Sequence, residues 1–266
     1  MPDPSVRSEV RDGVARLTLN RPDVLNALNG SLAAELADAA EAAARDSDVL
    51  VVVVQGAGAS FSSGMDRNAL AAGEIGEPFY RHWIRALNCL EDMGKLSIAA
   101  LHGYCLGGGL QLALACDLRI ATSDAVLGLG ATRHGLIPDG AVLRLARVVG
   151  IGRAKELALL NDNISAEEAR AVDLVNWVVA REELEEALAR IVDKAFQAAP
   201  TAVRHTKWLL HRSFHVDPRA MIEELIVAQT ECMTSWELAL ANRAWKEKRD
   251  ARYYPRPAGS ESPGAG

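Results

Sequence analysis

The chain has 266 residues, and its 35 acidic against 29 basic side chains give a formal net charge of −6 at pH 7. This mild acidic excess provides no field for a phosphate backbone, so we expect no nucleic-acid partner. Hydrophobic residues make up 49% and charged residues 24%, the proportions of an ordinary globular protein. The length permits one large core, with room for a second, smaller domain.

No apolar run approaches the roughly 18 residues of a membrane-spanning helix, and the first residues lack the apolar stretch of a secretory signal. We therefore expect a cytoplasmic protein with no membrane partner. The four cysteines are too few and too scattered for a disulfide framework, and are expected to be reduced thiols. No set of His, Cys and carboxylate residues has the spacing of metal ligands, so no metal site is predicted.

The first two thirds of the chain alternate between β-like runs and helical stretches. The apolar run Leu50–Val54 is typical of a strand buried on both faces, as in a covered parallel sheet. Ser165 and Glu168 form a capping-box pattern, which predicts the start of a short helix. Further strands are predicted over 14–20, 98–101, 118–121, 126–129 and 175–179, and helices over 31–45, 79–93, 107–115 and 141–149.

From about residue 181 the pattern is helical, over 182–198, 201–214 and 218–248, and no strand pattern interrupts it. We predict three parts: a core over 1–198 that carries the functional site, a helical assembly region over 199–254, and a loose tail over 255–266. The tail is rich in Pro, Gly, Ser and Ala, and cannot bury enough apolar surface to order itself.

Two glycine-containing loops, Ser60–Asp66 and His102–Leu110, each follow a predicted strand and lead into a helical stretch. Such sites present unpaired backbone N–H groups at the positive end of a helix dipole. Two donors aimed at one point form an oxyanion hole, which stabilises charge on a carbonyl oxygen. The alternative is that the glycines only permit close packing of helix and strand, and the glycines alone leave it open.

The motifs taken together resemble the enoyl-CoA hydratase/isomerase (crotonase) superfamily. The resemblance runs in order from about residue 10 to 250 and is specific for the superfamily, but less so for one reaction. The segments that carry it are NRP at 20–22, LNALN at 25–29, FSSGMD at 61–66, GYCLGGG at 103–109, ACD at 115–117, GLIPDG at 135–140, ISAEEA at 164–169 and WKEKR at 245–249.

The resemblance implies an α/β fold, a spiral of ββα units with a helical C-terminal trimerisation region, assembled as a homotrimer or a dimer of trimers. It implies an acyl-CoA thioester as ligand and no separate cofactor, since coenzyme A is part of the substrate. The backbone N–H groups of Met65 and Gly108 would be the oxyanion donors. The implied substrate-binding residues are Val24, Ala27, Gly64, Asp66, Arg67, Asn68, Gly107, Gln111, Ala131, His134, Trp245 and Lys248.

Hydratases of this superfamily carry one Glu just after the glycine triplet and a second further along. In this chain these positions are Gln111 and Ala131. Gln cannot transfer a proton near neutral pH, although its amide can orient a water, so the two-Glu route of hydration is not predicted. Asp139 stands where isomerases and a dehalogenase of the superfamily carry a functional Asp. Its alternative role is a helix N-cap, and the two roles can coexist.

The prediction is an isomerase-type double-bond shift, in which Asp139 moves a proton while Met65 and Gly108 hold the dienolate. Hydratase or other lyase or hydrolase activity is an alternative, as is nucleophilic use of Asp139 on an aromatic acyl-CoA. A further alternative is an inactive acyl-CoA-binding protein, suggested by Gln111 and Ala131. RNA binding, known for some relatives, disagrees with the charge.

Two histidines and an arginine have open roles. His134 and Arg133 lie near Asp139 in sequence, and are either acyl-pocket residues or solvated loop side chains. His82 falls in a region where the dehalogenase branch uses a His, but its spacing does not match.

Overall fold

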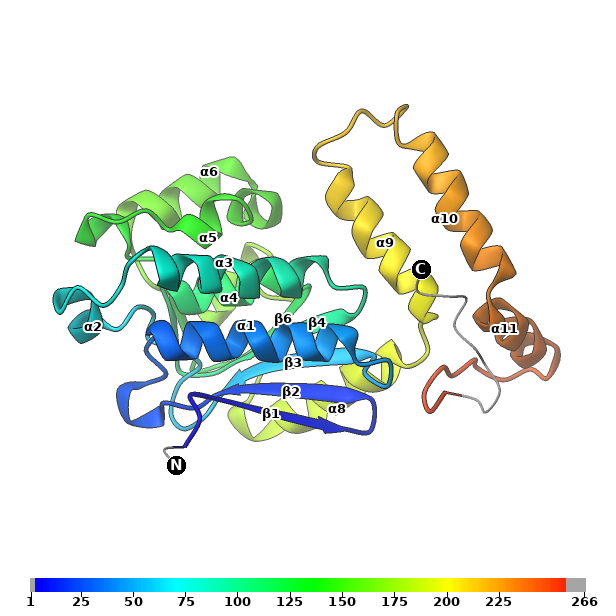
Figure 1. Cartoon of the computed structure of the whole chain (residues 1–266), viewed down its shortest axis with the longest axis horizontal. Coiled ribbons are helices and arrows are strands. Elements are labelled where there is room, and N and C mark those ends of the chain that lie inside the picture. Colours follow the sequence, from blue (N-terminus) through cyan, green and yellow to red (C-terminus); the bar gives the residue numbers. More distant parts are fainter. Residues whose placement is uncertain (1–2, 257–266) are drawn as a thin grey trace.

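The computed structural model describes residues 3–256 and contains two sheets (Figure 1). The six-stranded sheet has the order β1-β2-β3-β4-β6-β9 and is parallel except for the edge strand β1. A smaller sheet has the order β5-β7-β8. The strands are β1 (Val6–Arg11), β2 (Val14–Leu19), β3 (Val51–Gly56), β4 (Leu96–Leu101), β5 (Tyr104–Leu106), β6 (Leu118–Thr122), β7 (Val126–Gly128), β8 (Ile164–Ser165) and β9 (Trp177–Val179).

The large sheet is covered on both faces, which explains its continuous apolar strands. Val52 and Val54 face a core shared with α1 (Gly30–Arg45) and α3 (Glu77–Asp92), whereas Val51 and Val53 face α8 (Leu184–Ala195). Because successive strand residues point to opposite faces, a strand covered on both sides has no polar positions. Figure 1 shows α1 and α3 on one side of the sheet and α8 on the other.

The predicted strands are all present, and so are the helices α1, α3 and α4 (Gly108–Ala115). The predicted capping box is present at α7 (Ala166–Ala171), where Ser165 and Glu168 hydrogen-bond reciprocally. The helix expected over 141–149 was wrong, because α5 and α6 are separate there. Strands β1, β5 and β8 and helix α2 were not predicted from the sequence. The helices concerned are α2 (Arg67–Ala71), α5 (Asp139–Val142) and α6 (Leu145–Leu160).

The C-terminal region is helical, as predicted, but the single helix expected over 218–248 is wrong. It is divided into α10 (Ile222–Thr234) and α11 (Trp236–Lys246). Ser235 between them has extended backbone angles (φ −76°, ψ 155°), and its side chain accepts the N–H of Leu238. This cap ends one helix and begins the next. Residues 257–266 of the predicted tail lie outside the described residues.

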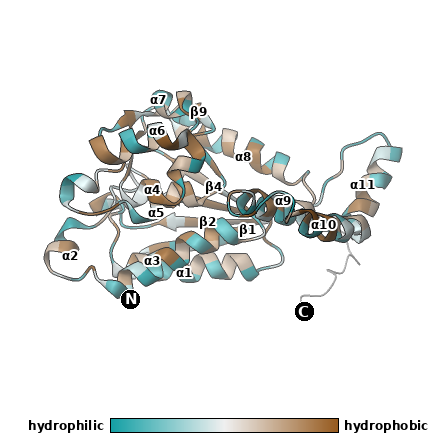
Figure 2. Cartoon of the chain, turned by 90° about the horizontal axis from the view of Figure 1, so that it is seen from above, coloured by the Kyte–Doolittle hydropathy of each residue, from teal (hydrophilic) through white to brown (hydrophobic). Residues whose placement is uncertain are grey.

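The helices α9 (Pro200–Arg212), α10 and α11 extend away from the two sheets (Figure 1). Figure 2 shows long apolar segments along α10. Within residues 3–256, no helix combines the length and apolar character needed to cross a membrane.

Lys207 ties α9 to the sheet core. Its ammonium lies 2.9 Å from Oδ2 of Asp117 and donates to the backbone oxygens of Leu90 (3.0 Å) and Lys95 (3.1 Å). The Lys207 and Asp117 side chains are only 9% and 15% exposed, and Asp117 also accepts the N–H of Ser97 at 2.7 Å. A buried, multiply bonded ion pair of this kind is costly to break from one side.

We expect Lys207→Met to lower the free energy of unfolding by about 3 kcal/mol, because Asp117 would keep a buried charge without its cation. Urea denaturation followed by circular dichroism measures this. Lys155→Met, at an exposed position of α6, is the matched control and should change stability by less than about 0.5 kcal/mol. An unchanged midpoint in Lys207→Met would show that apolar contacts alone hold α9.

Candidate active site

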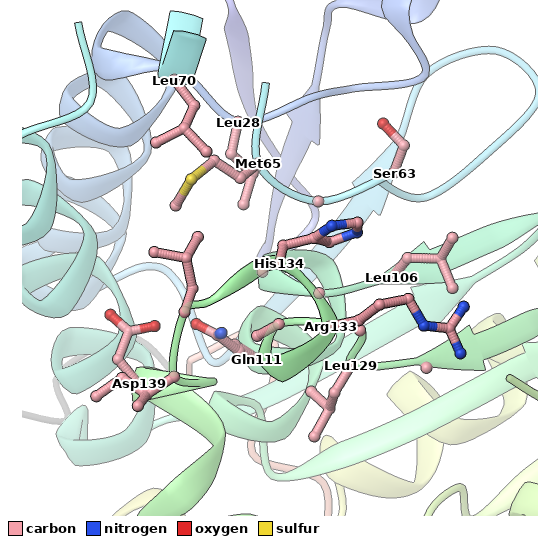
Figure 3. Close-up of a pocket in the computed structure, with 18 of the residues that line it drawn as sticks. Leu28, Ser63, Met65, Leu70, Leu106, Gln111, Leu129, Arg133, His134 and Asp139 are labelled. Carbon is pink, nitrogen blue, oxygen red and sulfur yellow. The ribbon is translucent and has the colours of Figure 1, made fainter. Parts of the chain in front are cut away.

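A cavity of about 330 Å³ lies where the loops after β3 and β4 meet the N-terminus of α4 (Figure 3). One part of its wall is the backbone of residues 63–65 and 106–108, and another is the side chains of α3. The segment 128–139 completes the wall. The cavity therefore joins the two glycine-containing loops that the sequence analysis singled out.

The first loop presents the N–H of Met65. Leu28 pairs with this segment as a short parallel bridge, in which its N–H donates to the oxygen of Gly64 (2.8 Å) and its oxygen accepts the N–H of Asp66 (2.9 Å). Backbone groups alternate in direction along an extended segment, so the N–H of Met65 points away from Leu28. Within residues 3–256 this N–H has no hydrogen-bond acceptor.

The second loop presents the N–H of Gly108, the first residue of α4. The preceding Gly107 has φ +51° and donates to the oxygen of Gly128 at 2.8 Å. Gly108 is one of the helix-terminal residues whose N–H has no intrahelical partner, and the described residues supply no other acceptor. The positive end of α4 thus adds to the donor at this part of the wall.

Glycine fits at these points because Gly64 lies against the backbone of the second loop and Gly108 lies against the side chain of Leu28. A Cβ at Gly64 (φ +89°) would lie 2.8 Å from the oxygen of Leu106, and one at Gly108 would lie 2.3 Å from Cδ1 of Leu28. The glycines therefore do serve close packing. The same packing brings two unpaired N–H groups to one cavity, so the two explanations of the glycine motifs are compatible.

Asp66 anchors the first loop. Its carboxylate caps α2 by accepting the N–H groups of Asn68 and Ala69, and it pairs with Arg21 at 3.0 Å. Burial acts to raise the pKa of this carboxyl, but the hydrogen bonds from Ala69 and Arg21 outweigh it and hold the pKa below its usual value. Asp66 therefore fixes the residue next to Met65 without lining the cavity itself.

Gln111 lies on α4 at the cavity wall and is only 5% exposed. Its side-chain oxygen accepts the indole N–H of Trp83 at 3.1 Å and the backbone N–H of Gly140 at 3.3 Å. The sequence predicts that this amide can orient a water. Its oxygen already accepts two hydrogen bonds, which leaves the NH₂ group for that role.

Asp139 is the first residue of α5, and the N-cap position belongs to Pro138. The alternative role of Asp139 as a helix cap is wrong, since no cap hydrogen bond forms there. The carboxylate has no hydrogen-bond partner among residues 3–256 and lines the cavity. Tyr80 of α3 lies nearby: burial, and secondarily the charge of Asp139, raises the pKa of its phenol.

The structure brings most of the predicted site residues to this cavity and leaves others away from it. Trp245, for example, is 79% exposed near the end of α11. Those that line the cavity are Gly64, Met65, Arg67, Gly107, Gly108, Gln111, Ala131, His134 and Asp139. Those that do not line it in this chain are Val24, Ala27, Asp66, Asn68, Trp245 and Lys248.

Of the three residues with open roles, Arg133 and His134 line the cavity and His82 does not. Several lining residues were not named individually from the sequence, among them three on one face of α3. Their helical spacing was a usable signal, because Phe79 and Trp83 are four residues apart. Lining residues not named from the sequence include Leu70, Phe79, Tyr80, Trp83, Asn161 and Asn163. Within the described part of the chain, no group of three metal-ligating side chains is present.

An α/β spiral with a helical C-terminal region and two loop N–H groups on one cavity is the arrangement of crotonase-type proteins. The sequence profile of the enoyl-CoA hydratase/isomerase family matches residues 9–256. The chain is 36% identical over 247 residues to the short-chain-enoyl-CoA hydratase of Clostridium acetobutylicum, covering 89% of this chain and 92% of that protein. It is 31% identical to the peroxisomal Delta(3,5)-Delta(2,4)-dienoyl-CoA isomerase of Arabidopsis thaliana, covering 93% and 95%.

Solved structures agree. The enoyl-CoA hydratase of Bacillus anthracis matches with a TM-score of 0.87 and 32% identity, covering 94% of this chain and 98% of that one. Pseudomonas aeruginosa DspI matches with a TM-score of 0.85 and 31% identity, covering 93% and 96%. The chain belongs to the enoyl-CoA hydratase/isomerase family, and the predicted fold class is confirmed.

We expect Asp66→Asn to lower the free energy of unfolding by about 1 kcal/mol at pH 7, because Asn keeps the cap but loses the pairing with Arg21. A carboxyl whose pKa is lowered by folding stabilises the protein above its unfolded pKa of about 3.9 and loses this contribution as the pH falls through the folded pKa. The difference between wild type and variant should therefore disappear in acid.

Urea titrations at pH 7, 5 and 3 measure this difference. Asp23→Asn, an exposed position in the neighbouring loop, is the control and should show no such dependence. A difference that persists undiminished at pH 3 would contradict the role of the Asp66 charge.

Proposed function

We propose that the protein binds an enoyl-CoA thioester and catalyses an isomerase-type shift of its double bond, with Asp139 as the acid–base residue. One observation carries the proposal: among the described residues that line the cavity, Asp139 is the one with a carboxylate. It has no hydrogen-bond partner there, so it is available to a substrate. Membership of the family supports a CoA thioester as ligand.

In the proposed reaction the thioester oxygen accepts the N–H groups of Met65 and Gly108. These donors stabilise the negative charge that develops when a proton leaves the carbon next to the carbonyl. With a double bond between the third and fourth carbons, Asp139 removes a proton from the second carbon and a dienolate forms. Asp139 then returns the proton to the fourth carbon, which leaves the double bond between the second and third carbons.

Hydration requires an activated water as well as a proton donor, and the described wall of this cavity has one carboxylate for both tasks. Gln111 cannot exchange a proton, and its oxygen is occupied by Trp83 and Gly140. Ala131 has no polar side-chain atom. Hydratase activity nevertheless remains the second candidate, because the Clostridium acetobutylicum protein at 36% identity is named a hydratase.

We expect Asp139→Asn to lower kcat for isomerisation of a 3-enoyl-CoA by about 10²–10⁴-fold, the usual contribution of a general acid–base group. Spectrophotometric or mass-spectrometric detection of the 2-enoyl-CoA product measures it. Affinity for butyryl-CoA, which cannot react, should be retained. Asp173→Asn, at an exposed position just after α7, is the matched control.

Equal turnover by wild type and Asp139→Asn would overturn the acid–base role. Faster hydration of crotonyl-CoA than isomerisation of a 3-enoyl-CoA would support the hydratase alternative. Tight binding of acyl-CoA with no product across a thioester panel would identify an inactive binding protein.

We propose further that the chain assembles as a homotrimer or a dimer of trimers through its C-terminal helices. Large apolar residues are exposed on α9 and α10, more than single copies of a chain usually leave in water. They are Trp208, Leu210, Ile222, Leu225, Ile226 and Val227. The cytoplasmic location stays a prediction, since relatives include proteins named as mitochondrial and peroxisomal.

We expect light scattering to give a mass three or six times the 28.5 kDa of the chain. Val227→Asp should lower that mass, because it places a charge in the apolar face of α10. Val10→Asp, on the exposed part of β1, is the control and should leave the mass unchanged. A wild-type mass of one chain would contradict the assembly.

A further inference from the structure

Two N–H donors fix the orientation of the Gln111 side chain. The indole N–H of Trp83 and the backbone N–H of Gly140 lie 3.1 and 3.3 Å from the same amide atom. Both groups can only donate, so this atom must be the amide oxygen. Trp83 is 1% exposed and Gln111 5%, so both residues are held in a buried setting. The amide is therefore locked in one of its two orientations.

The lock turns the NH₂ group of Gln111 toward the cavity. The amide nitrogen has no hydrogen-bond acceptor among residues 3–256. It is not fully buried either: the fully buried, unpaired side-chain N and O atoms in this part of the chain are Arg144 Nε and Glu237 Oε2. Gln111 lines the cavity, and Figure 3 shows its amide near the carboxylate of Asp139. The wall therefore carries a free donor beside the proposed acid.

Gly140 links this donor to Asp139. A Cβ at Gly140 would lie 2.9 Å from the Gln111 oxygen and 2.6 Å from Cδ1 of Leu87, so a side chain here would have to displace Gln111 or Leu87. The bonded N–H belongs to the peptide unit that follows Asp139. One hydrogen bond thus holds the Gln111 amide next to the backbone that carries Asp139.

The unpaired NH₂ group of Gln111 affects which acyl groups the cavity binds tightly. A purely hydrocarbon acyl chain would strip water from the donor and give it no acceptor in return. An acyl group with an oxygen atom close to Gln111 would accept a hydrogen bond from this NH₂ group. The nearby charge of Asp139 repels a carboxylate, which leaves a neutral hydroxyl or carbonyl oxygen as the matching group.

We propose that Gln111 is a specificity-determining residue that selects acyl-CoA thioesters bearing a hydroxyl or carbonyl oxygen on the acyl chain, and that Trp83 is its positioning residue. This inference rests on the proposed function in one respect, the CoA thioester as ligand. It does not depend on the double-bond shift or on Asp139 as the acid–base group.

Titration calorimetry with butyryl-CoA, 3-hydroxybutyryl-CoA and acetoacetyl-CoA tests the proposal. We expect wild type to bind at least one oxygenated ester about 10-fold more tightly than butyryl-CoA, the difference that one satisfied buried donor makes. Gln111→Met removes the donor at similar volume and should reduce that ratio to about 1. Gln197→Met, at an exposed position, is the matched control and should keep the wild-type ratio.

Trp83→Phe supplies the readout for positioning. It removes the indole N–H but keeps an aromatic ring, so the ratio of oxygenated-ester to butyryl-CoA affinity should fall although the Gln111 donor is still present. Gln111→Glu replaces the NH₂ donor by a carboxylate oxygen. The acyl chain of acetoacetyl-CoA has only acceptor oxygens, which a carboxylate repels, so this variant should bind acetoacetyl-CoA less tightly than butyryl-CoA.

Equal affinities for all three esters in wild type, or a preference that survives in Gln111→Met, would overturn the inference. Binding with the expected ratio but no isomerisation would defeat the proposed reaction and leave the inference in place. If none of the three esters binds, the CoA ligand is wrong and both proposals are overturned.

Discussion

The site depends on one short pairing between two loops that are distant in sequence. Ser62 donates to the oxygen of Tyr104 at 2.8 Å and accepts the N–H of Leu106 at 2.9 Å. This pairing sets the loop after β3 against β5, and a glycine is required beside it: a Cβ at Gly103 would lie 2.2 Å from the oxygen of Ala59. Because the loops are held this closely, the N–H groups of Met65 and Gly108 reach the same cavity.

The cavity is rich in hydrogen-bond donors and poor in carboxylates. Its wall holds two free backbone N–H groups, the Gln111 amide and the cations Arg67 and Arg133, against a single carboxylate among the described lining residues. Such a wall is well suited to stabilise negative charge on a bound thioester, and it is poorly suited to activate a water for hydration. The overall charge of −6 therefore says little about the site, because its local charge has the opposite tendency.

The features that the sequence predicted correctly are those set by short-range contacts along the chain. The strand at Leu50–Val54 was identifiable because burial on both faces leaves no polar position, and Ser165 marked a helix start because capping is a local contact. β1 was missed because only its first residue is buried, so it has no apolar pattern. Family motifs located Met65, Gly108 and Asp139, but the contact of Trp83 with Gln111 depends on how α3 packs on α4, which no spacing in the sequence records.

The replacement of the first hydratase carboxylate by Gln111 has a consequence for Asp139. The N–H of Gly140, at the start of α5, donates to Gln111, and Asp139 stays unpaired among the described residues. A glutamate at position 111 could accept the same N–H, but it would place a second negative charge beside Asp139 and disfavour its ionised form. Gln111 thus satisfies the helix start without charge, and this leaves Asp139 as the single ionisable carboxylate that the described wall offers to a bound acyl group.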